Sequence, residues 1–460
     1  MLKDIRRLHF IGIGGYGMSA LARVLLHLGY AISGSDLKQS EITEKLALQG
    51  AKIYYGHEAQ NLGEAQLVVY STAIPEDNPE IKASKAKGLP IWHRSELLAH
   101  FLNGRYGIAI AGAHGKTTTT SMVALVLTHG GLDPTAFIGG VLADFDGNAR
   151  MGDSHFLVAE ADESDYSFLR YRPNIAVVTN IEADHLEHYE DDFSKLLEAY
   201  RGFLSNIKPD GSAILNADDS HLPAMHPGHV ANIITYGRRP GANFRPSNEE
   251  VVGWGTRFTV LQDDDRLGQI TLRVPGEHNV DNALATVAVA NQIGIPFDRI
   301  KTGLEMFRGA KRRFQFLYQQ DRVAVVDDYA HHPTEVRATL KAARFGKPSR
   351  VIAVFQPHRY NRTHLFMDEF ARSFSGADKV FLHKIYSAGE KPIPGVTSAE
   401  LARRMREYGT DVTQIDDSSD LVEAVLEAVR PGDLVLNMGA GDITEICHTM
   451  AKKLSERKDA

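Results

Sequence analysis

Short apolar runs alternate with segments of helical periodicity along most of the chain. In the first block the runs cover residues 8–12 and 67–71, and a further strand ends at Asp36. Helices are expected over about residues 18–28 and around residues 96–102. Because strands that alternate with helices form parallel sheets covered on both faces, the pattern predicts an α/β fold.

The alternation continues through two further blocks. A chain of 460 residues is too long for one hydrophobic core. Asn103 to Arg105 reads as a linker, and a second boundary is expected near Gly309 to Lys311. These breaks predict domains at 1–104, 105–310 and 311–460. The later strands are expected at 106–111, 156–160, 175–180, 323–326, 351–355 and 434–437, with an antiparallel hairpin over 256–274.

The composition and net charge of the chain limit the classes of binding partner that can be expected. The chain has 51 Lys and Arg against 58 Asp and Glu, a net charge of −7, which does not favour a nucleic acid or a membrane surface as partner. The single cysteine, Cys447, is typical of a reducing compartment. No apolar run approaches the ~20 residues of a membrane span. A cytoplasmic protein is therefore expected.

The segment from Tyr106 to Thr120 is an apolar run that breaks into a glycine turn and continues as a lysine followed by threonines. Such a turn exposes backbone N–H groups at a helix N-terminus, where an anion is favoured. Lys116 would then reach the β- and γ-phosphates of a nucleotide, and Thr117 would hold Mg²⁺. The usual phosphate loop has four residues between its glycines, whereas Gly112 and Gly115 are separated by two.

A second glycine turn lies near the N-terminus, where Gly12, Gly14, Gly15 and Gly17 separate a strand from a helix. There the glycines admit a pyrophosphate, and Asp36 at the end of the next strand meets a ribose hydroxyl. The alternative is a tight turn beside a solvated aspartate. Alone, the turn favours an NAD-dependent dehydrogenase, but two phosphate sites favour coupling of nucleotide hydrolysis to a nucleotide-linked substrate.

Candidate metal ligands follow two central strands. Glu160 ends the strand expected beside the phosphate-loop strand, where a carboxylate is directed toward the metal, whereas Asp162 and Glu163 are interpreted as solvated loop acids. His185 follows the next strand, at the edge where open sheets bind ligands. With Thr117 and Glu160 it would complete one or two Mg²⁺ sites, and a surface histidine is the alternative.

Polar side chains near the second boundary suit a nucleotide. Asn279 and Asn282 lie three residues apart at the start of an expected helix and share one face. Helix capping is an alternative for Asn279 but does not explain Asn282. Arg312 and Arg313 open the third block, and an arginine from a neighbouring domain suits stabilisation of a transferring phosphoryl group. A solvated pair is the alternative.

Two strand ends in the third block are rich in polar groups. Residues 327–335 bring two aspartates, a tyrosine and two histidines together after an apolar strand. After the next strand, His358, Arg359 and Arg362 suit a carboxylate, because arginine binds carboxylates in bidentate fashion. An ordinary basic loop is the alternative for the arginines.

Four of these segments together resemble the Mur ligases of peptidoglycan synthesis. They are residues 9–19, 112–120, 327–335 and 355–359, and the likeness spans essentially the whole chain in motif order. The two-residue gap between the loop glycines is characteristic of that family. Two positions depart from it: Ala113 stands where threonine is usual, and Ala330 replaces a common glycine.

The resemblance implies an ATP-dependent, Mg²⁺-requiring ligase that joins an amino acid to the lactyl carboxylate of UDP-N-acetylmuramate through an acyl phosphate. It implies a Rossmann-like N-terminal domain for the UDP end of the substrate and a central P-loop ATPase domain with a parallel sheet and a small antiparallel part. A Rossmann-like C-terminal domain would close over the site. Residues 198–203 lack the lysine that later-acting members often carry, which agrees with L-alanine as the amino acid. A monomer or homodimer is expected.

By the same resemblance, Lys116, Glu160, His185 and Arg313 are the catalytic residues, and Thr117, Glu160 and His185 are the metal ligands. ATP would be bound by Gly112, Ala113, His114, Gly115, Lys116, Thr117, Thr118, Asn279, Asn282, Arg313 and, at its ribose, Asp328. The UDP substrate would be bound by Gly14, Gly15, Gly17, Met18, Asp36, Ser71 and Thr72. The amino acid would be bound by Tyr329, His331, His358, Arg359 and Arg362.

Three alternatives stay open from the residues. A related ligase attaches a recycled tripeptide to the same sugar nucleotide and shares most of these motifs. An NAD-dependent dehydrogenase would use the N-terminal turn. A P-loop regulatory switch would hydrolyse ATP without needing both a sugar nucleotide and an amino acid.

Overall fold

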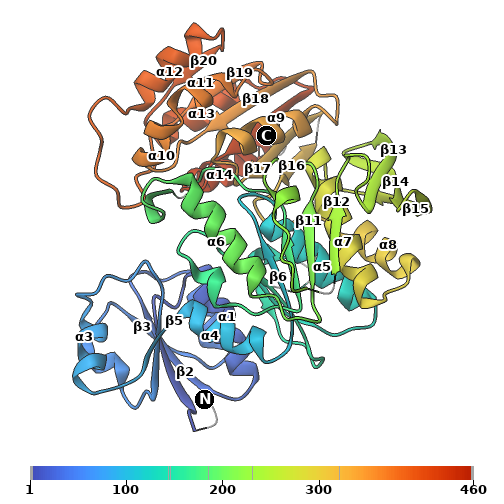
Figure 1. Cartoon of the computed structure of the whole chain (residues 1–460). Coiled ribbons are helices and arrows are strands. Elements are labelled where there is room, and N and C mark those ends of the chain that lie inside the picture. Colours follow the sequence, from blue (N-terminus) through green and yellow to red (C-terminus); the bar gives the residue numbers. More distant parts are fainter. Residues whose placement is uncertain are drawn as a thin grey trace. The chain divides into compact units, whose positions relative to one another are not determined.

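The computed structural model describes residues 4–142, 145, 147–184, 186–230, 232–320 and 322–456. The chain divides into two compact units, each described by itself. The first comprises Met1–Ser247, Thr259–Ile270 and Asp281–Met306. The second comprises Asn248–Phe258, Thr271–Val280 and Phe307–Ala460. Element labels follow Figure 1.

A five-stranded parallel sheet begins the first unit, with strand order β3-β2-β1-β4-β5. Its strands are β1 (Arg7–Ile11), β2 (Ala31–Asp36), β3 (Lys52–Tyr55), β4 (Leu67–Tyr70) and β5 (Ile91–His93). Its helices are α1 (Tyr16–His27), α2 (Glu41–Leu48), η1 (Ala59–Leu62), α3 (Pro79–Ala86) and α4 (Arg94–Asn103). This order matches five of the six strands of the Rossmann sheet, whose topological switch point corresponds to the carboxyl ends of β1 and β4.

Both faces of this sheet are covered, as its apolar strands predict (Figure 1, blue). Phe10 and Val69 pack on the side of α1 and α4, whereas Ile11 and Val68 pack on the side of η1 and α3. Neighbouring strand residues therefore point to opposite faces.

A ten-stranded sheet follows, with strand order β15-β14-β13-β12-β11-β10-β6-β9-β7-β8. Its strands are β6 (Tyr106–Ala111), β7 (Thr135–Leu142), β8 (Gly147–Arg150), β9 (Phe156–Glu160), β10 (Ile175–Val178), β11 (Ser212–Asn216), β12 (Asn232–Tyr236), β13 (Phe244–Val252), β14 (Gly255–Gln262) and β15 (Asp265–Leu272). Its helices are α5 (Lys116–His129), η3 (Ser167–Arg170), η4 (Leu186–His188), α6 (Phe193–Ser205), η5 (Leu222–Ala224), α7 (Glu277–Ile293) and α8 (Phe297–Met306).

The central strands of this sheet position the predicted phosphate loop, residues 112–115, between β6 and α5. β6 lies between β9 and β10 and is parallel to both. Helix α6 covers one face of the sheet, and α5, α7 and α8 lie on the other (Figure 1). The loop after β6 therefore opens at a carboxyl edge where open α/β sheets bind ligands.

The predicted hairpin joins β14 to β15, which are neighbours in the sheet. Only Asp263 and Asp264 link the two strands, with φ of +48° and +76°. Two residues in this left-handed region form the turn that suits the twist of an antiparallel hairpin. The prediction of a small antiparallel part is therefore confirmed.

The second unit contains a six-stranded sheet with strand order β16-β17-β21-β18-β19-β20, parallel apart from β16. Its strands are β16 (Gln315–Gln320), β17 (Val323–Asp328), β18 (Arg350–Phe355), β19 (Lys379–Leu382), β20 (Val412–Gln414) and β21 (Asp433–Met438). Its helices are α9 (Pro333–Ala343), α10 (Tyr360–Leu365), α11 (Met367–Arg372), α12 (Ser398–Glu407), α13 (Ser418–Ala428) and α14 (Ile443–Glu456).

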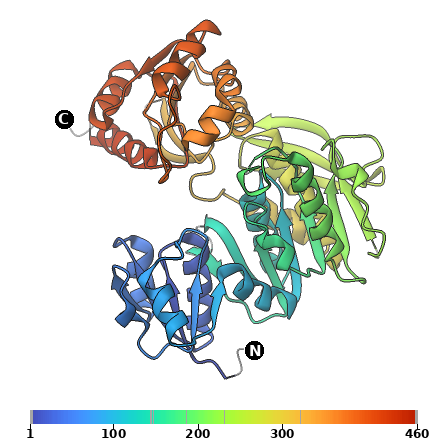
Figure 2. The same cartoon turned by 60° about the vertical axis from the view of Figure 1, so that its left-hand side comes forward.

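Helices cover both faces of this sheet too (Figure 2, orange and red). Leu434 and Leu436 of β21 pack on the side of α9, α11 and α12, whereas Val435 packs on the side of α13 and α14. The expected α/β class with parallel sheets is confirmed. Over the described ranges, no helix combines the length and the apolar character that crossing a membrane requires.

Candidate active site

The phosphate loop joins β6 to α5 and needs glycine at two positions. Gly112 has a φ of +135° and Gly115 a φ of +85°, which residues with a Cβ atom rarely adopt. A Cβ atom on Gly112 would lie 2.0 Å from Thr179 Oγ1, and one on Gly115 would lie 2.6 Å from Asn282 Oδ1. The loop therefore packs directly against the segment after β10 and against α7.

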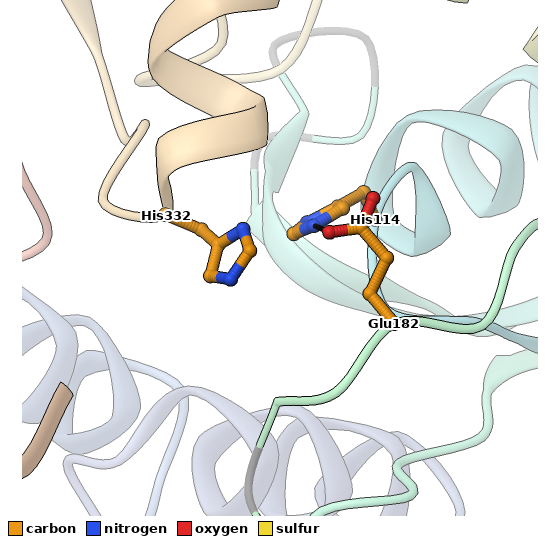
Figure 3. A group of neighbouring side chains, drawn as sticks. All are labelled: His114, Glu182 and His332. Carbon is orange, nitrogen blue, oxygen red and sulfur yellow. Dashed lines mark hydrogen bonds and ion pairs between the residues drawn. The ribbon is translucent and has the colours of Figure 1, made fainter. Parts of the chain in front are cut away.

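His114, between these glycines, is fixed by the residues that follow β10. Its N–H donates to Asn180 Oδ1 (2.8 Å), and its carbonyl accepts from Asn180 Nδ2 (3.0 Å) and Thr179 Oγ1 (2.6 Å). Its ring Nε2 lies 3.3 Å from a Glu182 carboxylate oxygen, and Figure 3 shows these two side chains next to each other. Ala113 donates its N–H to the Asn180 carbonyl (3.1 Å), so the loop is held by backbone bonds without a hydroxyl there.

Lys116, the first residue of α5, folds its side chain over this loop. Its Nζ donates to the carbonyls of Gly112 and Ala113 and lies 2.7 and 2.9 Å from the two Glu163 carboxylate oxygens. Burial by itself lowers the pKa of Lys116, but the carboxylates of Glu163 and Asp162 outweigh it and raise that pKa above its usual value. The lysine is therefore a cation at neutral pH.

The interpretation of Asp162 and Glu163 as solvated loop acids is wrong. Glu163 is only 3% exposed and its carboxylate faces Lys116. Asp162 accepts from Arg94 Nη2 at 3.1 Å. Burial raises the pKa of Asp162, but Arg94 and Lys116 outweigh it and hold that pKa well below its usual value. Glu163 is thus a buried ionic partner of Lys116, and Asp162, though partly exposed, is ion-paired with Arg94.

Two of the three predicted metal ligands lie beside neighbouring residues of β7. Glu160 at the end of β9 accepts from the Gly139 N–H at 2.6 Å. The Thr117 methyl group would lie 3.1 Å from a Cβ atom on Gly140, the next residue. A carboxylate and a hydroxyl are the oxygen donors that Mg²⁺ prefers, so this pair fits that ion. His185, the third predicted ligand, lies outside the described residues.

Asn282 lies at the phosphate loop, whereas Asn279 has a local partner. Asn282 Oδ1 accepts from Thr119 Oγ1 at 3.1 Å, next to Gly115. Asn279 Nδ2 donates to the Pro275 carbonyl at 2.6 Å. The alternative that Asn279 caps the helix is wrong, because α7 already begins at Glu277.

The N-terminal glycine turn follows β1 and contacts the end of β2, as the spacing predicts. The Gly14 N–H donates to Asp36 Oδ2 at 2.9 Å, and a Cβ atom on Gly14 would lie 2.8 Å from that oxygen. Gly15 precedes α1 as its N-cap, and Met18 inside that helix is buried. The turn and the carboxylate therefore lie together at the carboxyl edge of the first sheet.

The residues after β4 contact the loop after β9. Thr72 Oγ1 lies 2.8 Å from Asp165 Oδ2 and 3.1 Å from His93 Nε2. Ser71 accepts the Ile74 N–H through its carbonyl in a tight turn. One short loop thus carries Asp165, which meets Thr72, and Glu163, which meets Lys116.

In the second unit, Asp327 and Asp328 end β17 and are buried. Asp328 accepts the N–H groups of Phe314 (2.7 Å) and Ala330 (2.8 Å). Burial, opposed by Arg313, raises the pKa of Asp328 to about 6. Ala330 is not among the described non-glycine residues with positive φ, so this loop does not require glycine there.

Tyr329 and His331 extend this strand end. The guanidinium groups of Arg312 and Arg313 lie 4.8 and 5.3 Å from the Tyr329 ring centroid, which is cation–π geometry. His331 Nδ1 lies 2.8 Å from the Tyr329 carbonyl. His332, also drawn in Figure 3, is the N-cap of α9.

His358 joins the same cluster from the next strand. Its ring lies 5.7 Å from the His331 ring and stacks on Tyr386 at 5.5 Å, and Arg362 Nη1 is 3.3 Å from its Nδ1. Burial, and then the charges of His331 and the nearby arginines, lower the pKa of His358 to about 3. His358 is therefore neutral at physiological pH. Arg359, with a φ of +69°, donates its N–H to the Tyr386 carbonyl.

Several contact residues were not predicted from the sequence. Glu163 and Tyr386 are the main ones, since each directly contacts a predicted site residue. The one available signal for Glu163 is that its loop follows β9, which neighbours the phosphate-loop strand β6, and this signal does not separate it from a solvated loop acid. Tyr386 follows β19 with no motif around it, and no local signal marks it.

Family models match the chain in three consecutive parts. The catalytic domain model of the Mur ligase family matches residues 7–106, the middle domain model matches residues 110–290, and the glutamate ligase domain model matches residues 312–441. The expected order of motifs is therefore the order of the family's domains.

Relatives of known name cover the whole chain. The UDP-N-acetylmuramate–L-alanine ligase of Symbiobacterium thermophilum is 48% identical over 466 residues, with 99% of this chain and 96% of that protein covered. The crystal structure of the UDP-N-acetylmuramate–alanine ligase of Thermotoga maritima matches with a TM-score of 0.85 at 29% identity, over 98% of this chain and 99% of that one. A murein peptide ligase of Psychrobacter arcticus matches with a TM-score of 0.71 at 25% identity, over 98% of both chains.

These matches agree with the site geometry: a short phosphate loop, a strand-end carboxylate beside it and a second glycine turn upstream. The family models together span most of the chain, and the 48% identical relative spans nearly all of it. The chain therefore belongs to the Mur ligase family, as its motifs predicted.

Proposed function

We propose that this protein catalyses the ATP-dependent joining of L-alanine to the lactyl carboxylate of UDP-N-acetylmuramate, the first amino-acid addition in peptidoglycan precursor synthesis. The observation that carries the proposal is the full-length likeness to ligases of that name, together with a phosphate loop of the family's short form. The enzyme is expected to act in the cytoplasm.

The proposed division of labour follows the expected domains. Residues 1–104 take the UDP end of the substrate, through Gly14, Gly15, Gly17, Met18, Asp36, Ser71 and Thr72. Residues 105–310 bind ATP, and residues 311–460 bind the amino acid. The glycine turn beside Asp36 supports the first assignment, because a backbone N–H and a carboxylate meet at the carboxyl edge of the sheet.

The ATP site is assigned to the phosphate loop and its neighbours. Lys116 would bind the β- and γ-phosphates, with Asn282 beside the loop and Asn279, Arg313 and Asp328 as further contacts. Thr117, Glu160 and His185 would hold Mg²⁺, which polarises the γ-phosphate and offsets charge in the transition state. The oxygen donors of Thr117 and Glu160 support this choice of metal.

The amino-acid pocket is assigned to Tyr329, His331, His358, Arg359 and Arg362. The carboxylate of L-alanine suits arginine, which offers two parallel N–H donors. His358 supports this role because it is neutral and accepts from Arg362, so it orients that guanidinium without adding charge.

In the proposed reaction the lactyl carboxylate attacks the γ-phosphorus of ATP, which gives an acyl phosphate and ADP. The amine of L-alanine then attacks the acyl carbon, and inorganic phosphate leaves. Carboxylate and triphosphate repel each other, so Lys116 and Arg313 must offset this repulsion. Holding the reacting groups in line contributes about 7–11 kcal/mol to lowering the barrier.

The test is phosphate release from ATP in the presence of UDP-N-acetylmuramate, with L-alanine, glycine, L-serine or the recycled tripeptide as the second substrate. Turnover that needs the sugar nucleotide and is fastest with L-alanine is expected. Faster turnover with the tripeptide would transfer the assignment to the recycling ligase. ATP hydrolysis that needs neither acceptor would indicate a regulatory switch, and NADH binding would indicate a dehydrogenase.

Lys116→Ala is expected to abolish ADP formation, because the loop then has no side-chain cation for the phosphates. Lys45→Ala is the control: Lys45 lies in an exposed ion pair with Glu41 on α2. Substantial residual turnover by the Lys116 variant would overturn the assignment of this loop to ATP.

A further inference from the structure

The ion pair between the partly buried Lys116 and the buried Glu163 has no part in the roles assigned above. Both Glu163 carboxylate oxygens lie within 2.9 Å of Lys116 Nζ, and Glu163 is 3% exposed. We infer that Glu163 is a positioning residue that holds the Lys116 ammonium while no nucleotide is bound and yields it to the nucleotide phosphates. The inference rests on the proposed role of Lys116 in binding those phosphates.

The first step is a count of donors on Lys116. An ammonium group has three N–H donors. The Gly112 carbonyl, the Ala113 carbonyl and the Glu163 carboxylate together accept all three. A phosphate oxygen can therefore bind Lys116 only by replacing one of these acceptors.

Glu163 is the acceptor that a phosphate replaces. The two carbonyls belong to the loop that cradles the phosphates and carry no net charge, so they tolerate an anion nearby. A buried carboxylate beside an incoming phosphate is a like-charge contact, which is unfavourable where water is largely excluded. Nucleotide binding is therefore favoured by separation of Lys116 from Glu163.

The main chain that carries Glu163 is bonded to its surroundings, so the carboxylate can move only by rotation of its own side chain. The Tyr189 hydroxyl, itself buried, donates to the Glu163 carbonyl. The preceding residue, Asp162, accepts from Arg94 Nη2 at 3.1 Å. The exchange is therefore assigned mainly to Lys116, whose longer side chain turns from the carboxylate to the phosphate.

Two consequences follow for the reaction. Glu163 competes with every nucleotide phosphate that reaches Lys116, so it weakens binding of both ATP and ADP. After phosphoryl transfer, recapture of Lys116 by Glu163 favours the departure of ADP. Glu163 thus acts through the lysine and touches no reacting atom.

The test is calorimetric titration of ADP and of AMP, each with Mg²⁺, into the full-length protein and into Glu163→Gln. Glutamine keeps the shape of the side chain and removes its charge. We expect ADP to bind about tenfold more tightly to the variant. In the wild type, ADP has to break the charge-assisted hydrogen bond between Glu163 and Lys116, and in the variant this cost is absent. AMP has no β-phosphate to reach Lys116, so its affinity should stay within about twofold.

Two further variants separate this role from others. Glu190→Gln removes an equal charge at an exposed position, where the partner is Lys195, and should leave ADP binding unchanged. Glu163→Asp keeps the charge but shortens the side chain by one methylene, which loosens the hold on Lys116. It should tighten ADP binding as well, and it serves as the test if Glu163→Gln does not fold.

Equal or weaker ADP binding by the Glu163 variants would overturn the inference, and so would equal tightening of AMP, which indicates a general change in the site. A wild-type protein that binds no ADP would overturn it together with the proposed function. ADP binding without phosphate release in the ligase assay would overturn the proposed function alone.

Discussion

Replacing Glu80 with glutamine is expected to lower the unfolding free energy of the first unit by about 3 kcal/mol. Glu80 lies on α3 and is fully buried. Its carboxylate accepts from Ser35 Oγ (2.6 Å), Asn61 Nδ2 (2.7 Å) and the Glu58 N–H (3.3 Å), and it lies 3.4 Å from Nε2 of the buried His9. These neighbouring groups thus point hydrogen-bond donors at the Glu80 carboxylate.

The size of the loss in unfolding free energy follows from the hydrogen bonds that a glutamine at position 80 cannot accept. One of the two carboxylate oxygens becomes an NH₂ group, which meets donors already pointing at that position. A hydrogen bond to a charged group contributes about 1.5–3 kcal/mol, and a buried donor left without an acceptor costs about 1–3 kcal/mol. Partial rearrangement of the Ser35 hydroxyl keeps the sum near 3 kcal/mol.

Urea unfolding followed by Trp92 fluorescence measures this loss where it occurs. Trp92 lies on β5 in the same sheet as the Glu80 network, and the other tryptophan, Trp254, belongs to the second unit. A Trp254→Phe background therefore isolates the signal. Glu64→Gln is the control, because the Arg7–Glu64 ion pair is mostly exposed and such pairs contribute less than about 1 kcal/mol.

The pH dependence provides a second check on the same residue. Burial raises the pKa of Glu80, but hydrogen bonds from His9, Ser35 and Asn61 outweigh it and hold that pKa below its ordinary 4.5. A lowered pKa stabilises the folded state above the ordinary value, and this stabilisation is lost as the pH falls through the folded-state pKa. The difference in unfolding free energy between wild type and Glu80→Gln should be largest at pH 7 and become smaller in acid. A loss no larger than that of Glu64→Gln, or a difference independent of pH, would refute this reasoning.

Three other changes test separate features. Gly112→Ala should destabilise the first unit by more than about 2 kcal/mol in calorimetry, because its φ is positive and its Cβ atom would clash with Thr179; an unchanged melting temperature would contradict this. Burial raises the pKa of Asp328 to about 6, so the folded state holds that proton more tightly and stability falls as the pH rises from about 4 to 6. Asp328→Asn should remove this slope from a pH series of urea unfolding, and an identical slope would count against it. Arg359→Lys should raise the KM for L-alanine far more than that for ATP in steady-state kinetics, because lysine lacks the bidentate fork; equal effects would remove Arg359 from that pocket.

Much of the fold could be predicted from the sequence, because buried strands and tight turns each leave a recognisable pattern in the residues that form them. The apolar run over β6 is a strand buried on both faces, and the glycines after it mark a turn that no other residue fits. Asp263 and Asp264 supply the hairpin turn. The pairing order of ten strands in the central sheet has no such local signature, since strand partners are chosen by contacts between distant segments.

The site could be predicted where a residue's role depends on its own segment. Gly14 and Asp36 meet because the ends of neighbouring parallel strands meet. Glu163 was misjudged because an acid in a polar loop is usually solvated, and its burial depends on residues distant in the chain, Lys116 of α5 and Tyr189. Tyr386 was missed because stacking on His358 is set by the packing of two strand ends, with no pattern along the chain.

The loop after β9 shows why charged residues in a loop can be structural. Within four residues it provides Asp162 to Arg94, Glu163 to Lys116 and Asp165 to Thr72. Arg94 begins α4 and Thr72 follows β4, whereas Lys116 begins α5, so one loop joins the N-terminal sheet region to the helix after the predicted phosphate loop. Each carboxylate is paired with a partner from another element, and a solvated loop would have no reason to keep three acids so close together. The cluster is therefore better explained by the partners it joins than by solubility.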